Sequence, residues 1–147
     1  MPSARVLAGL LAALAVAAAG CGGDDTPAPT KEQYVRQANA TCKVANEKLT
    51  SSAVKAFAGA QPTEASVEQY AKDSGYPTLD QLIEDLRTLT PPKGDEDTVA
   101  GLYDALQGAV DKTKDDPKLL TAPEETGPFK DANQKLNAYG LGACGAG

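Results

Sequence analysis

The sequence predicts an all-α protein, a small up-and-down bundle of four to five helices closed by one disulfide. Apolar residues recur at steps of three and four in five segments, and Pro or Gly residues separate these segments from one another. No stretch has the alternating, β-branched pattern of a strand, and the chain has no internal repeat. The elements are expected in the following order.

The first helix is expected to run from a cap at Thr30 to about Ala58. Gln33 stands three residues after Thr30, as in a capping box. Gly59 and Pro62 follow the helix and end it. One face of this helix carries the apolar residues Tyr34, Ala38, Cys42, Ala45, Leu49 and Ala53.

Two shorter helices should follow. Thr63 opens the second helix, which ends near Gly75, and Tyr76-Pro77 is expected to break the chain. Thr78 then caps the third helix, and Pro91-Pro92 stops it. The inward face of the third helix consists of Leu79, Leu82, Ile83, Leu86 and Leu89.

The fourth helix is expected to begin at the three acids 95–97, which favour the positive end of a helix dipole. Asp116-Pro117 ends it, and residues 117–126 are expected to form a loop with a short turn at 118–120. The last helix should run from about residue 127 to Tyr139, with Gly140 as its C-cap.

Residues 1–20 have the pattern of a bacterial lipoprotein signal peptide. Arg5 supplies the positive charge, and the 14 residues from Val6 to Ala19 are almost unbroken Val, Leu and Ala. This run is too short to cross a bilayer as a helix, which needs ~20 apolar residues. The run leads into Ala18-Ala19-Gly20-Cys21, which predicts acylation of Cys21, for instance with palmitate. The alternative is an ordinary secretory signal cut at an Ala-x-Ala site, with Cys21 incidental.

This interpretation divides the chain into a signal peptide (1–20), a flexible tether (21–29) and a helical domain (30–147). The tether is rich in Gly, Asp and Pro and has no apolar periodicity. We therefore expect the domain to be held at the extracytoplasmic face of the cell membrane by lipid on Cys21. The other two cysteines, Cys42 and Cys144, form an even pair in an oxidising compartment, so a disulfide is expected between them.

The charge of the chain excludes one class of partner. The chain has 14 basic and 20 acidic residues, and removal of residues 1–20 takes away only Arg5, which changes the net charge from −6 to −7. An acidic domain gains nothing from phosphate backbones, so we expect no nucleic-acid partner. The membrane attachment must come from the lipid, because anionic headgroups repel the domain.

Three short segments resemble a known group of proteins. They are Gln37 to Asn46 around Cys42, the Leu89-Thr90-Pro91-Pro92 stop, and the closing Tyr139 to Gly145 around Cys144. Together they resemble small, Ala-rich helical lipoproteins of actinobacteria that have a Cys in the first helix and a second Cys in a Gly-rich C-terminal segment. The resemblance implies the bundle and the disulfide, and it brings no activity.

The sequence carries no recognisable catalytic motif. It contains no His, which removes the Ser-His-Asp and Cys-His arrangements and the commonest metal ligand. It also lacks a P-loop and the G-x-S-x-G and Rossmann glycine patterns. The neighbouring acids 84–85, 95–97 and 124–125 are expected on solvated faces or at helix starts. We therefore expect no enzyme, no metal and no cofactor.

One set of polar residues is a candidate ligand site. Asn39, Lys43, Asn46 and Thr50 form a stripe beside the apolar face of the first helix and could line a groove for a small polar ligand. The alternative is the ordinary solvent boundary of an amphipathic helix. Three functions are consistent with the sequence: a protein-interaction or structural module, a small-ligand-binding lipoprotein, and, more remotely, a cryptic hydrolase.

Overall fold

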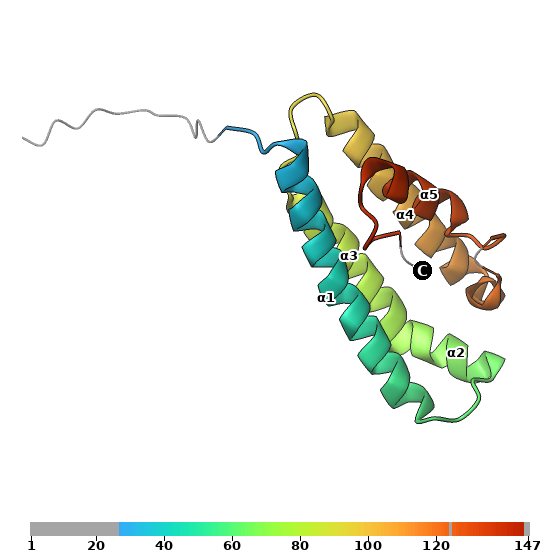
Figure 1. Ribbon diagram of the computed structural model, residues 1–147. Coiled ribbons are helices and arrows are strands. Elements are labelled where there is room, and N and C mark those ends of the chain that lie inside the picture. The colour runs from blue at the N-terminus through green and yellow to red at the C-terminus, as the bar shows by residue number, and fades with distance from the viewer. Residues whose placement is uncertain (1–26, 124, 146–147) are drawn as a thin grey trace, which may run out of the picture.

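The computed structural model of the protein describes residues 27–123 and 125–145 (Figure 1). The chain runs down α1, back up α3, down α4 and back up α5 (Figure 1). The prediction of an all-α, up-and-down bundle with four helices packed together is confirmed. In chain order the elements are α1 (Lys31–Phe57), α2 (Glu64–Tyr70), the π-helical η1 (Ala71–Gly75), α3 (Tyr76–Thr88), α4 (Glu96–Asp115), the 3-10 helix η2 (Pro117–Thr121) and α5 (Lys130–Tyr139).

The core of the bundle is built from the predicted faces. On α1 the buried residues are Tyr34, Ala38, Cys42 and Ala45, each on the expected stripe. Leu82, Ile83 and Leu86 of α3 are buried, and α4 contributes the longest buried row. That row consists of Val99, Leu102, Tyr103, Leu106, Ala109, Val110 and Thr113.

The helix ends follow from local hydrogen bonding. The Thr30 capping box is confirmed: the Thr30 N–H donates to Gln33 Oε1 at 2.8 Å, and the Gln33 N–H donates to Thr30 Oγ1 at 3.3 Å. Gly140 ends α5 in the left-handed region with φ 109°, as predicted for a C-cap. Ala58 ends α1 in the same region with φ 45°, where a side chain is disfavoured.

The predicted break at Tyr76-Pro77 is wrong. The chain stays helical from Glu64 to Thr88, because η1 joins α2 to α3 through a turn in which the Tyr76 N–H donates to the Ala71 carbonyl, five residues back. A π turn is wider than an α turn. It places Pro77 at the start of α3, where its missing N–H is tolerated. Thr78 is accordingly a buried residue inside α3 and not its cap.

The segment before α5 is also less helical than expected. The Gly127 N–H donates to the Pro123 carbonyl, and Pro128 has no N–H to donate, so residues 127–129 form a turn. The helix begins at Lys130 instead of residue 127. The short turn expected at 118–120 is present as η2.

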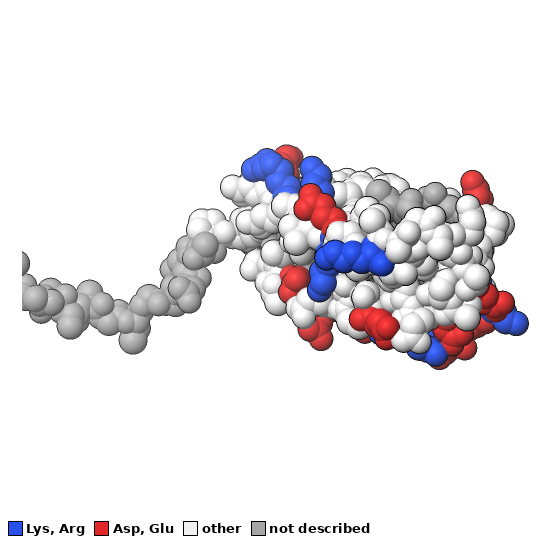
Figure 2. All heavy atoms as spheres, turned by 90° about the horizontal axis from the view of Figure 1, so that it is seen from below, with Lys and Arg blue, Asp and Glu red and all other residues white. Residues whose placement is uncertain are grey.

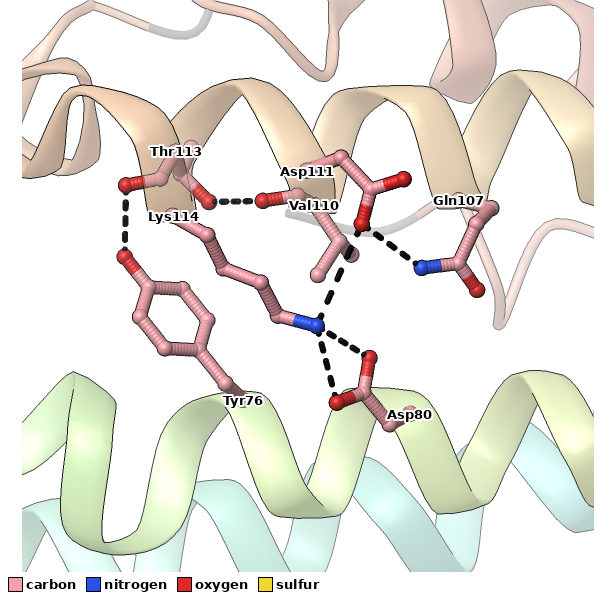
Figure 3. A network of polar contacts seen from close by, with 7 residues as sticks. All are labelled: Tyr76, Asp80, Gln107, Val110, Asp111, Thr113 and Lys114. Carbon is pink, nitrogen blue, oxygen red and sulfur yellow. Dashed lines mark hydrogen bonds and ion pairs between the residues drawn. The ribbon is translucent and has the colours of Figure 1, made fainter.

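Polar contacts fix α3 against α4 (Figure 3). Lys114 Nζ of α4 lies 2.7 and 2.9 Å from the two carboxylate oxygens of Asp80 on α3. On the next turn the Tyr76 hydroxyl donates to the Thr113 carbonyl at 2.7 Å. The Tyr76 contact is buried and the Lys114 contact is partly exposed, so the tyrosine bond contributes more to holding this pair of helices.

Candidate ligand-binding pocket

The C-terminal segment lies against α1 and is held there covalently. Cys42 of α1 and Cys144 form a disulfide with their Cα atoms 5.0 Å apart, which confirms the predicted pair. The Cys42 side chain is fully buried. The last residues of the described chain therefore form part of the wall of the bundle.

Two of the four candidate polar residues on α1 hold this segment. Asn39 Nδ2 donates to the Gly140 carbonyl, and Asn39 Oδ1 accepts from the Ala143 N–H, both at 2.9 Å. Asn46 Nδ2 donates to the Ala143 carbonyl at 2.8 Å. The other two candidates, Lys43 and Thr50, are exposed. Asn39 and Asn46 therefore have a structural role, because they hold the C-terminal segment against α1.

An apolar pocket of about 280 Å³ lies between α1, α3, α4 and the segment from η2 to α5. Its apolar wall consists of Leu49, Leu79, Leu82, Leu106, Leu119, Leu120, Ala122, Pro128 and Phe129. Cys144 lines it as well, so the disulfide that fixes the C-terminal segment also fixes one side of the pocket. Small-molecule sites are concave and mostly apolar, with a few placed polar groups.

Among the described residues, the polar side chains at the pocket wall are the amides of Asn46 and Asn133. Asn133 of α5 is only 8 % exposed. Asn133 lines the apolar pocket and also a neighbouring hollow.

The neighbouring hollow is polar. Asn133 is common to both, and the hollow is also lined by Glu125, Lys130, Gln134 and Asn137. Among the described residues it is lined by one acid, Glu125, and one base, Lys130, whose charges balance. The apolar pocket has no charged lining residue at all among the described residues. A molecule that occupied the apolar pocket and the polar hollow together would contact uncharged apolar side chains in the first and side-chain amides in the second.

A second buried cluster contains three tyrosines between α1, α4 and α5. The hydroxyl groups of Tyr34 and Tyr103 share a hydrogen bond, and the Tyr139 hydroxyl donates to Asp95 Oδ2 at 2.6 Å. Burial raises the pKa of Tyr34, and burial together with the Tyr34 bond raises the pKa of Tyr103. Burial and the bond to Asp95 raise the pKa of Tyr139. These phenols stay protonated and join three helices, which is a structural role.

Two of the three acids 95–97 accept hydrogen bonds within the described residues. Asp95, directly before α4, accepts from the Tyr139 hydroxyl of α5, and Glu96 Oε2 accepts from the Gly94 N–H at 2.7 Å. The pKa of Glu32 is lowered by hydrogen bonds from its own backbone and from Thr30. Within the described residues no group of three His, Cys, Asp or Glu side chains could hold a metal ion. Residue 124 of the pair 124–125 lies outside them.

The pocket was not predicted from the sequence. Leu119 and Leu120 line it from η2, and Phe129 lines it from the turn before α5. The signal in the sequence was the pair of adjacent leucines inside a segment otherwise rich in Pro, Thr and acids. Two large apolar side chains in such a segment indicate that it is packed onto the bundle.

Comparison with known proteins gives no match to a family model, to a curated protein or to a solved structure. None of the helices among the described residues is long and apolar enough to cross a membrane. Residues 1–26, which include the predicted signal peptide, the predicted acylation site Cys21 and most of the predicted tether, lie outside the described residues.

Proposed function

We propose that this protein is a non-enzymatic binding domain, anchored by lipid on Cys21 at the outer face of the cell membrane, that takes a small apolar ligand. The observation that carries the proposal is the pocket of about 280 Å³ with its leucine wall. An apolar cavity of ~150 Å³ in a helical core is large enough to bind benzene, so the volume is sufficient for a larger hydrocarbon group.

The anchoring part of the proposal rests on the leader sequence and the cysteines. Ala18-Ala19-Gly20-Cys21 follows a charged and then apolar leader, and a tether of Gly, Asp and Pro precedes α1. The Cys42–Cys144 disulfide supports an oxidising compartment, because such bonds are rare in the reducing cytosol.

A protein-interaction module has weaker support. Such a surface needs an apolar patch of several hundred Å². The large exposed hydrophobic residues of the described chain are Val44 and Val54, which lie ten residues, or ~15 Å, apart along α1. A broad uncharged area is seen on the face in Figure 2, at the end of the bundle where residues 58–63 connect α1 to α2. Those residues are Ala, Gly, Gln, Pro and Thr, which supply little apolar area.

A hydrolase has weaker support still. Catalysis near neutral pH without His needs a carboxyl group with a raised pKa, or a Lys or Tyr with a lowered one. The apolar pocket is lined by no Asp, Glu, Lys or Tyr among the described residues. A pocket wall of leucines and amides therefore favours binding without chemistry.

The test is fluorescence binding of the neutral probe N-phenyl-1-naphthylamine to the chain with Cys21 replaced by Ser, so that no acyl chain of its own competes. Ala122 is half-buried and lines the pocket, whereas Ala105 on α4 is equally half-buried and does not. Ala122→Phe should weaken probe binding at least tenfold, and Ala105→Phe should leave it unchanged. Equal binding by both variants, or no binding by the parent chain, would refute the proposal.

A further inference from the structure

We infer that the pocket takes one aliphatic chain of an uncharged, hydroxyl-rich amphiphile, such as a monoacylglycerol or an alkyl glycoside, and that Asn133 binds its head group. This inference rests on the proposed function and names the class of ligand. It is carried by the single amide that borders both the apolar pocket and the polar hollow.

The chain length follows from the volume of the pocket. A cavity of ~150 Å³ holds the six carbon atoms of benzene. By the same proportion, a pocket of about 280 Å³ holds roughly eleven carbon atoms. The wall is aliphatic apart from Phe129, which suits a flexible chain. A chain of about ten carbons fills the pocket, and a longer chain must leave its remaining methylenes outside.

The position of the head follows from Asn133. This side chain is more than nine-tenths buried, and it lines both the apolar pocket and the polar hollow. A ligand hydroxyl or ester in the apolar pocket could therefore lie beside this amide and form a hydrogen bond with it. The carbonyl oxygen of the amide accepts from a hydroxyl and its NH₂ group donates to an ester or hydroxyl oxygen, so both kinds of head atom are satisfied.

The charge of the head follows from the lining. No charged side chain of the described residues lines the apolar pocket, so a carboxylate at its mouth would lose water without gaining a cation. In the polar hollow Lys130 is accompanied by Glu125, which removes the preference for an anion. The amides of Gln134 and Asn137 complete a surface that hydrogen-bonds to hydroxyls of either donor or acceptor character.

The experiment is isothermal titration calorimetry on the full chain with Cys21→Ser, using decyl maltoside, monodecanoylglycerol and sodium decanoate, each below its micellar concentration. The two uncharged amphiphiles should bind, and decanoate should bind at least tenfold more weakly at pH 8. In an alkyl maltoside series the affinity should rise about fourfold per added methylene up to about ten carbons and then level off.

The variants separate the head from the chain. Asn133→Leu keeps the size of the side chain and removes its hydrogen bonds, so it should weaken decyl maltoside binding about three- to tenfold. Gln134→Leu changes the next amide on α5, which does not line the apolar pocket, and should have a smaller effect than Asn133→Leu. Ala122→Phe should abolish binding. The urea midpoint of each variant is measured first, and only variants that remain folded are compared.

The outcomes distinguish the inference from the proposed function. Decanoate binding as tight as decyl maltoside, or an Asn133→Leu variant that binds decyl maltoside like the parent chain, overturns the inference on the head group. A continued gain in affinity beyond about twelve carbons overturns the assignment of the chain length. If either of these results is found while N-phenyl-1-naphthylamine still binds and Ala122→Phe still blocks its binding, the proposed function is retained and only the inference on the ligand is refuted. If neither the probe nor any amphiphile binds, the proposed function and the inference are both refuted.

Discussion

Removing the Cys42–Cys144 disulfide should lower the stability of the bundle by several kcal/mol. The two cysteines are 102 residues apart in sequence. For a closed loop of this size the chain-entropy relation gives about 4.7 kcal/mol at 25 °C. With a urea m-value of about 1.5 kcal/mol per molar, the unfolding midpoint of Cys42→Ala/Cys144→Ala should fall by about 3 M relative to the oxidised parent chain.

The single variants test whether the effect comes from the bond. Either single substitution already removes the cross-link, so Cys42→Ala and Cys144→Ala should each cost about as much as the double variant, and their losses should not add. Cys42 is fully buried, so its variant also loses some packing. Urea unfolding followed by circular dichroism measures all three variants. A double variant within about 1 kcal/mol of the parent, or two small and additive losses, would contradict the entropic origin of the effect.

Four further predictions concern single positions. Asn39→Ala removes two hydrogen bonds to the C-terminal segment. It should cost about 1–3 kcal/mol in urea unfolding and speed amide exchange of residues 140–145, and unchanged exchange there would contradict it. Ala58→Gly relieves a left-handed alanine and should raise stability by up to about 1 kcal/mol; a loss of stability would be unexpected. Burial raises the pKa of the Tyr103 hydroxyl in the folded chain, so in the unfolded chain this hydroxyl loses its proton at a lower pH. The free energy of unfolding therefore falls as the pH rises past the ordinary tyrosine pKa of 10.0. Tyr103→Phe should therefore lower the free energy of unfolding at pH 7. Above pH 10 this loss should shrink by up to ~1.4 kcal/mol per pH unit, and a loss that grows with pH would refute the prediction. Mass spectrometry of the mature N-terminus should find a diacylglyceryl group on Cys21, and a free thiol there would exclude the anchor.

The sequence was sufficient for the fold wherever the local signal was strong. The Thr30 capping box, the stripe from Tyr34 to Ala45 and the Gly140 cap depend on neighbours within one or two turns, and all three are confirmed. The break predicted at Tyr76-Pro77 is wrong because a π turn, which keeps the chain helical ahead of a proline, has no clear signature in the sequence.

The site was predictable only in part. Asn39 and Asn46 were recognised as a polar stripe, but their partners are backbone groups about a hundred residues away, which no local pattern reveals. The pocket depends on Leu119, Leu120 and Phe129 folding back onto α1, α3 and α4. Asn133 gave no signal, because an amide on a short helix is ordinarily exposed and only the packed structure buries it.

Whether the pocket binds an aliphatic chain can be observed directly in a crystal structure of the complex with an alkyl maltoside that carries bromine on the terminal carbon of a ten-carbon chain. The anomalous signal locates the bromine without reference to the protein density. We predict a peak inside the pocket, among Leu82, Leu106 and Phe129, with the maltose beside Asn133. A peak on the outer surface of the bundle, or no peak at a ligand concentration that saturates binding in solution, would contradict the proposed binding mode.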